Sequence, residues 1–113
     1  MLDVRQEMKL PPPIAQFFEA FNLHDADAVV ARFANDAVVA DEGRKYRGAK
    51  IKTWIDKVNA DYKPKAKVIS LVRAANKHIV TAQVSGSFPG SPIQLRYHFT
   101  LKKGKIASLV CGT

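Results

Sequence analysis

The 113-residue chain contains one cysteine, Cys111, and three histidines that are far apart in the sequence. One cysteine cannot form a disulfide within the chain, and Cys111 has no companion histidine with which to build a zinc site. His24, His78 and His98 lack the spacing of a metal-binding motif. The sequence therefore predicts neither a metal centre nor a bound cofactor. Cys111 itself is expected to be a small, buried apolar side chain.

Long apolar runs are also missing. The apolar stretches span only a few residues, far fewer than the roughly 20 that cross a bilayer. The N-terminal segment carries acidic residues and no apolar core, so it does not resemble a signal peptide. We therefore expect a cytoplasmic protein with no membrane partner. Its length suits one hydrophobic core, which we place in a single domain at residues 14–113 after an N-terminal extension at residues 1–13.

Acidic side chains are absent from the C-terminal half. Residues 1–43 hold eight acidic and three basic side chains, whereas nine lysines and arginines follow Asp61 with no acidic residue among them. Such a basic segment can attract nucleic acid or an anionic ligand. No recognised RNA- or DNA-binding motif accompanies it, and Lys102, Lys103 and Lys105 share one turn. We interpret the basic residues as solvated side chains of a sheet and its turns, and expect no nucleic-acid partner.

Two helices are predicted in the first third of the chain. Pro11–Pro13 can open the first helix, because the missing N–H of proline costs nothing in a first helical turn. Apolar residues then recur at helical spacing, namely Ile14, Phe17, Phe18 and Phe21. Asp25 is a favourable N-cap for a second, short helix, which is expected to bury Val29, Val30 and Phe33. A turn is predicted at Asn35 and Asp36.

A short strand at residues 37–40 is predicted next, and it delivers Asp41 at its end. A third helix is expected to begin near Ala49 and to end before Pro64, with the apolar stripe Ile51, Trp54, Ile55 and Val58. From Lys65 onward the apolar residues alternate instead. This period predicts strands at residues 66–75, 78–88, 93–102 and 105–112.

Three helices followed by a meander of strands predict an α+β fold, in which a cone-shaped, curved antiparallel sheet wraps around the N-terminal helices. Alternation assigns two faces to the strand at residues 93–102. The inward face is predicted to carry Ile93, Leu95, Tyr97, Phe99 and Leu101. The outward face is predicted to be solvated or to meet a second subunit, because it carries Gln94, Arg96, His98 and Thr100.

One extended pattern resembles a known superfamily. It reads Phe18-x-x-Phe21-Asn22-x-x-Asp25-x-x-x-Val29-x-x-x-Phe33-x-x-Asp36-Ala37-x-x-x-Asp41, followed by Tyr46-x-Gly48 and by a closing hairpin at residues 99–106. It resembles the nuclear transport factor 2-like superfamily, nearest to its SnoaL-like polyketide cyclases and ketosteroid isomerases, over about residues 14–112. The resemblance implies a cystatin-like cone, a homodimer formed through the outer sheet face, and a pocket for a small apolar or aromatic molecule.

The resemblance also suggests catalytic residues. In the ketosteroid isomerases, an aspartate at the end of the first strand takes a proton beside a carbonyl group, and a helical tyrosine and a late-strand aspartate hold the enolate oxygen. The base corresponds to Asp41 here, the helical tyrosine to Phe17, and the late-strand aspartate to Tyr97. Asp41 is thus the candidate base and Tyr97 a candidate donor. The alternatives are that Asp41 caps a turn with Glu42 and that Tyr97 is an ordinary core tyrosine.

Six aromatic residues are candidate ligand-binding residues: Phe17, Phe21, Phe33, Trp54, Tyr62 and Phe99. The alternative is that such a helical aromatic stripe is simply core. Three functions therefore stay open. The first is an isomerase or cyclase that uses Asp41 to move a proton alpha to a carbonyl in a small hydrophobic ligand. The second is a non-catalytic ligand-binding accessory protein, and the third a dimerising scaffold whose own aromatic residues fill the cavity.

Overall fold

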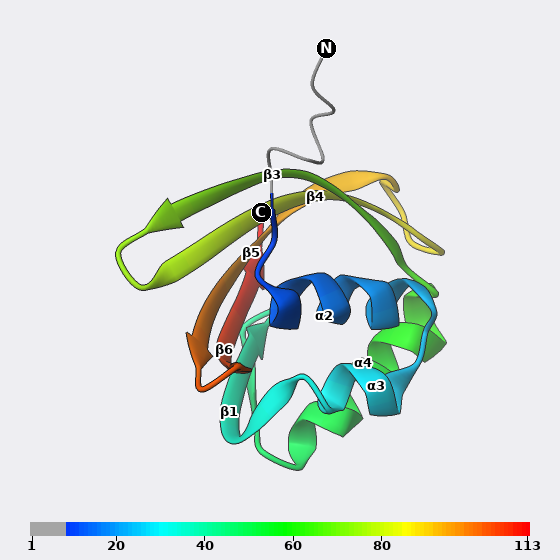
Figure 1. Ribbon diagram of the computed structural model, residues 1–113. Helices are drawn as coiled ribbons and strands as arrows, with labels where there is room; N and C mark the ends of the chain where they lie inside the picture. Colours follow the sequence, from blue (N-terminus) through cyan, green and yellow to red (C-terminus); the bar gives the residue numbers. More distant parts are fainter. Residues whose placement is uncertain (1–8) are drawn as a thin grey trace.

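A computed structural model describes residues 9–113 of the protein (Figure 1). Three helices come from the first part of the chain: α2 (Pro12–Asn22), α3 (Ala26–Val30) and α4 (Lys50–Tyr62). The strands are β1 (Phe33–Asp41), β2 (Arg44–Arg47), β3 (Lys65–Ala74), β4 (Lys77–Ser85), β5 (Ile93–Lys102) and β6 (Lys105–Gly112). The first eight residues of the predicted N-terminal extension lie outside this range. Within residues 9–113, no helix is long and apolar enough to cross a membrane.

The strands form one sheet in the order β2-β1-β6-β5-β4-β3. The predicted α+β class is confirmed, with one difference in the sheet. Strands β1 and β6 pair in parallel, whereas the other neighbours are antiparallel. The predicted curved antiparallel sheet is therefore mixed, with this one parallel pair. After β2, α4 and the meander, the chain returns as β6 beside β1 and runs in the same direction. No local pattern in the sequence encodes this pairing.

The sheet curves around α2, and α3 and α4 lie across the open side of the curve (Figure 1). The apolar stripe of α2 therefore faces the concave side of the sheet. Phe17 is fully buried there, and its ring centroid lies 5.4 Å from that of Phe99 and 6.0 Å from that of Phe33. Edge-to-face aromatic contacts of this kind fill one end of the cone with side chains.

Asn22 joins the end of α2 to the start of β3. Its side-chain amide donates to the carbonyl oxygen of Ala66 at 2.9 Å, and its side-chain oxygen accepts from the Ala66 N–H at 2.7 Å. His24 Nε2 lies 2.7 Å from the carbonyl oxygen of Pro64, to which it donates. These bonds satisfy backbone groups where the sheet begins and hold the meander against the helical layer.

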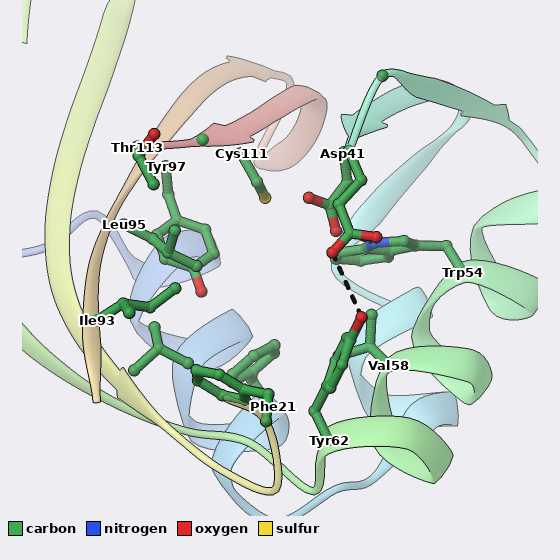
Figure 2. A pocket seen from close by; sticks show the side chains of 15 residues that line it. Phe21, Asp41, Trp54, Val58, Tyr62, Ile93, Leu95, Tyr97, Cys111 and Thr113 are labelled. Atoms are coloured by element: carbon green, nitrogen blue, oxygen red, sulfur yellow. Dashed lines mark hydrogen bonds between the residues drawn. The ribbon is translucent and has the colours of Figure 1, made fainter. Parts of the chain in front are cut away.

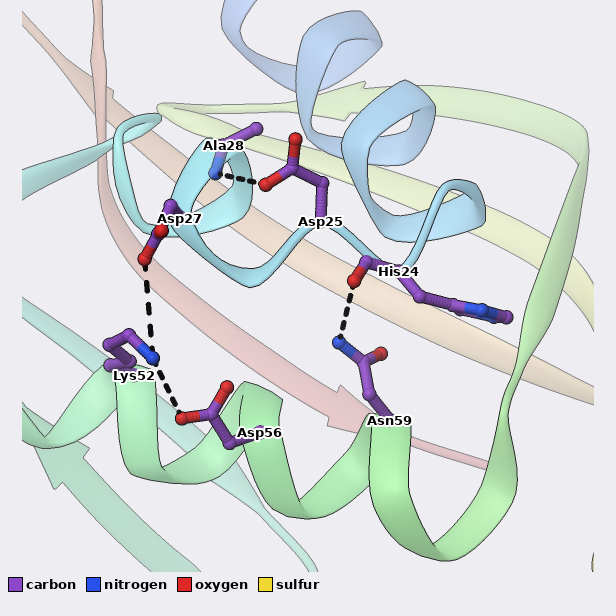
Figure 3. Close-up of polar contacts among 7 residues, drawn as sticks. All are labelled: His24, Asp25, Asp27, Ala28, Lys52, Asp56 and Asn59. Carbon is purple, nitrogen blue, oxygen red and sulfur yellow. Dashed lines mark hydrogen bonds and ion pairs between the residues drawn. The ribbon is translucent and has the colours of Figure 1, made fainter.

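Polar contacts hold α3 against α4 (Figure 3). The Asp25 side chain accepts a hydrogen bond from the Ala28 N–H at 3.1 Å and caps α3, as the sequence predicted. On α4, Lys52 lies 2.9 Å from Asp56 and 4.0 Å from Asp27 of α3, and Asn59 donates to the carbonyl oxygen of His24. The exposed ion pairs contribute little stability. The Lys52–Asp27 pair and the Asn59 hydrogen bond link α4, which carries Trp54, to α3 and to the loop before it.

Several local predictions differ from the structure. Asn35 and Asp36 do not form a turn but lie within β1, where the pairing with β6 is irregular and both side chains are exposed. The short strand β2 was not predicted, because Arg44–Arg47 lacks apolar alternation. Strand β4 ends at Ser85 instead of residue 88. The chain leaves the sheet there and packs against the end of α4. The approach is so close that a Cβ on Gly86 would lie 2.5 Å from the carbonyl oxygen of Tyr62.

Candidate functional site

A cavity of about 460 Å³ lies between the concave face of the sheet, α4 and the end of α2 (Figure 2). Its polar lining comes from Asp41, Glu42, Tyr62, Tyr97, Cys111 and Thr113. Its apolar lining comes mainly from Phe21, Trp54, Val58, Val84, Phe88, Ile93 and Leu95. The cavity is large enough for a small molecule, and a mostly apolar surface with a few polar groups is typical of such sites. It is open space and is not filled by the protein's own aromatic rings.

Asp41 stands at the edge of this cavity because of the turn that follows it. Glu42 and Gly43 have φ angles of 52° and 75°, which are the positive values of a two-residue hairpin turn. The turn ends β1 at Asp41, and β2 runs back beside it. The indole Nε1 of Trp54 donates a hydrogen bond to Asp41 Oδ2 at 2.9 Å. A strand end and a helix thus fix the carboxylate together.

The environment of Asp41 raises the pKa of its carboxyl above the ordinary value of 3.8. Burial is the largest cause, because it disfavours the charged form. The Trp54 indole opposes this effect, the negative charge of Glu42 adds to it, and the Glu42 N–H opposes it. A carboxylate with a raised pKa binds a proton more readily than an ordinary aspartate, which suits a general base.

Tyr97 faces the same cavity from β5 (Figure 2). Tyr97 is only 2% exposed. Its hydroxyl points into the cavity and makes no hydrogen bond to any side chain drawn in Figure 2. Burial is the main cause that raises the pKa of the phenol, and the nearby Cys111 and Asp41 raise it further. The hydroxyl therefore stays protonated and can donate a hydrogen bond to an oxygen in the cavity.

A second polar pair lies at the rim of the cavity, which is formed by Glu42, Tyr62 and Phe88. The Tyr62 hydroxyl lies 3.4 Å from Glu42 Oε1, so it donates a long hydrogen bond from α4 to the β1–β2 turn. The same tyrosine ring meets Phe88 edge to face, with centroids 5.7 Å apart. Phe88 belongs to the β4–β5 loop, which Gly86 brings close to the end of α4. The rim thus joins three segments that are distant in the sequence.

The structure brings together five of the eight residues that the sequence analysis selected. Asp41 and Tyr97, the candidate base and donor, line one cavity, and so do the three aromatic residues Phe21, Trp54 and Tyr62. The other three, Phe17, Phe33 and Phe99, are buried in the core and do not line the cavity. Phe17 and Phe99 pack directly on each other, which leaves neither ring facing the open end of the cone.

Several lining residues were not selected from the sequence. Ile93 and Leu95 share the inward face of β5 with Tyr97, so strand alternation could have found them. Glu42 belongs to the turn that follows Asp41, and Phe88 lies in a loop with no periodic signal. Cys111, expected to be an ordinary buried core residue, lines the cavity with part of its surface exposed, although its thiol is buried. Burial raises the pKa of its thiol well above the ordinary value, with Asp41 adding to the effect, so it is no ready nucleophile.

The sequence profile of the SnoaL-like domain matches residues 14–109, and the chain therefore belongs to the SnoaL-like domain family. This membership confirms the predicted resemblance. No curated protein matches the chain significantly.

Solved structures support the same assignment. A candidate polyketide cyclase from Sinorhizobium meliloti is 38% identical, with a TM-score of 0.87 over 91% of this chain and 95% of the other. A protein with a ketosteroid isomerase-like fold from Catenulispora acidiphila, in complex with trimethylamine, is 18% identical, with a TM-score of 0.81 over 93% and 87% of the two chains. A candidate polyketide cyclase from Pseudomonas putida is 19% identical, with a TM-score of 0.77 over 91% and 90%. Together with the family, the likeness to the Sinorhizobium meliloti protein supports a ligand-binding or an isomerase- or cyclase-type function, whereas the other two structures show the fold alone.

The raised pKa of Asp41 predicts a pH-dependent effect of Asp41→Asn on stability. Between pH 3.8 and the higher folded-state value, the folded wild type binds more protons than the unfolded chain does, so its free energy of unfolding falls as pH rises through this window. Asp41→Asn removes the titrating carboxyl group and therefore this loss of stability. Relative to wild type, the variant should therefore gain stability as pH rises through the window and keep the gain above it.

Urea unfolding at pH 3 to 8 measures this difference. The matched control is Asp36→Asn, whose carboxylate is exposed and lies 3.8 Å from Lys102, and which should change stability by at most about 1 kcal/mol. A constant difference between Asp41→Asn and wild type across the whole range would contradict the assignment of a raised pKa to Asp41.

Proposed function

We propose that the cavity binds a small, largely apolar carbonyl compound, and that Asp41 moves a proton at the carbon next to its carbonyl group. The observation that carries this proposal is that Asp41 and Tyr97 face one open, mostly apolar cavity of about 460 Å³. A base and a hydrogen-bond donor on opposite sides of a binding site are what an enolisation needs. The trimethylamine bound to the Catenulispora acidiphila protein supports a small molecule as ligand of this fold.

In the proposed reaction, the Asp41 carboxylate takes a proton from the carbon alpha to the carbonyl. The electron pair of the broken C–H bond forms the C=C bond of an enolate, and the carbonyl π electrons move to oxygen. The Tyr97 hydroxyl donates a hydrogen bond to that oxygen, where negative charge develops. Protonated Asp41 then returns the proton to another carbon of the conjugated enolate, which shifts the double bond, isomerises the ligand and restores the carboxylate.

The alternative function is a binding protein without chemistry. Phe17 favours it, because this residue corresponds to the oxyanion-holding tyrosine of the ketosteroid isomerases and has no hydroxyl. It is also fully buried in the core. Only one donor, Tyr97, would then hold an enolate, and each missing donor of this kind typically costs about 10²–10³ in rate. The two functions share the cavity and differ in whether Asp41 exchanges protons with the ligand.

Proton exchange into a flat, apolar ketone separates the two functions. With 2-tetralone in D₂O, the wild-type protein should accelerate the loss of the alpha-proton signals in the NMR spectrum. Asp41→Asn should reduce this catalysed rate by about 10²–10⁴-fold, because the amide cannot accept the proton. Tyr97→Phe should slow it by about 10²-fold. Asp36→Asn is the matched control and should leave it unchanged.

Binding of 2-tetralone without catalysed exchange would favour the accessory function. Equal exchange rates for wild type and Asp41→Asn would eliminate Asp41 as the base.

We also propose that two copies of the chain form a homodimer through the outer sheet face. Val72 on β3 and Val110 on β6 are 56% and 48% exposed, which is high for large apolar residues. Val110 pairs across the sheet with His98, on the side opposite the buried Tyr97 and Leu109. An exposed apolar surface on a sheet is a candidate for association with a second copy.

Sedimentation equilibrium at micromolar concentration tests the homodimer. Wild type should sediment as a dimer, and Val110→Asp should weaken the dimer more than about tenfold, because the interface would have to bury an unpaired charge. Leu23→Asp, at a position that is 72% exposed and outside the sheet, is the control and should remain dimeric. A wild type that sediments as a monomer would contradict the proposal.

A further inference from the structure

We propose that the ligand of this cavity carries a positively charged amine, which lies at the rim beside Glu42, Asp41 and the face of Tyr62. This inference rests on the proposed binding function and adds the substrate class. The ligand would be a carbonyl compound with an apolar body and an ammonium group at one end. The body would fill the apolar depth of the cavity, and the ammonium group would remain near its opening.

The charge of the cavity lining is the first observation. Among residues 9–113, two acidic side chains, Asp41 and Glu42, line it, whereas no lysine, arginine or histidine does. This is unexpected for a chain whose formal net charge is +8. Within residues 9–113, none of the ion pairs involves either carboxylate. The negative charge at the rim is therefore not balanced by the lining itself, and a bound cation would balance it.

The basic residue opposite Asp41 in the β1–β2 hairpin does not supply a balancing positive charge. Arg44 pairs with Asp41 across the β1–β2 hairpin, but its side chain is exposed and does not line the cavity. The negative charge of Glu42 is felt by both neighbours: it helps to raise the pKa of Asp41 and is the largest cause that raises the pKa of Tyr62. An ammonium group between these side chains would lessen that repulsion.

The aromatic side chains are the second observation. Tyr62 and Phe88 meet edge to face at the rim, and Trp54 lies beside Asp41. Figure 2 shows Tyr62 and Trp54 on the Asp41 side of the cavity, with Tyr97, Leu95 and Ile93 on the opposite side. Aromatic faces next to carboxylates are the usual surroundings of alkylammonium groups, because the ring face is electron-rich. The opposite side is apolar apart from the Tyr97 hydroxyl and so suits the body of the ligand.

A pair of ligands that match in shape and differ in charge tests the proposal: phenyltrimethylammonium and tert-butylbenzene. Trp54 is the single tryptophan of the chain and lies in the cavity, so its fluorescence reports binding there directly. Wild type should bind the cation more tightly than the neutral compound by about tenfold, because cation–π contact and the rim charge act together. Added salt should narrow this difference.

Glu42→Gln keeps the shape of the rim and removes one charge. It should weaken binding of phenyltrimethylammonium by about threefold to tenfold and leave tert-butylbenzene unaffected. Asp36→Asn, an equal loss of charge away from the cavity, should change neither affinity.

Tighter binding of tert-butylbenzene than of the cation would overturn the amine proposal and leave the binding function intact. An equal change in the affinities for both compounds in Glu42→Gln would overturn the amine proposal as well. If neither compound changes the fluorescence of Trp54, both the amine proposal and the proposed binding function fail.

Discussion

The hydrogen bond from Trp54 Nε1 to Asp41 Oδ2 is the contact on which the rest of the site depends. It joins the end of β1 to α4, two elements that otherwise meet mainly through the short strand β2. It holds the carboxylate at the edge of the cavity and partly offsets the burial that raises the pKa of Asp41. Without such a donor, a carboxyl in this position would be driven further toward its protonated form.

The cone is divided into a filled part and an open part. Around Phe17 the aromatic rings of α2, β1 and β5 pack together and leave no space, whereas around Phe21 and Trp54 the cavity stays open. The difference arises from the loop after β4 and from the end of α4, which meet at the rim instead of entering the cavity. The rings around Phe17 therefore stabilise the core, whereas Phe21 and Trp54 border the cavity proposed to bind the ligand.

Local patterns in the sequence predicted much of the fold. Three features follow from residues that are close in the sequence, and the structure contains all of them: the helical stripe of α2, the Asp25 cap, and the alternation of β3 to β6. Asp41 and Tyr97 were selected through the family resemblance. The parallel β1–β6 pair, Glu42 and Phe88 were missed, because each depends on contacts between segments distant in the sequence. Phe17, Phe33 and Phe99 show the converse: an aromatic stripe does not reveal which of its rings border open space.

The titration of the Asp41 side-chain carbon, followed by carbon-13 NMR with and without tert-butylbenzene, tests the central claim most directly. If Asp41 faces a ligand cavity, its pKa lies above 3.8 in the free protein and rises further when an apolar molecule displaces water beside it. We expect that rise in the pKa of Asp41. An ordinary pKa for Asp41, or one that does not respond to the apolar molecule, would contradict it.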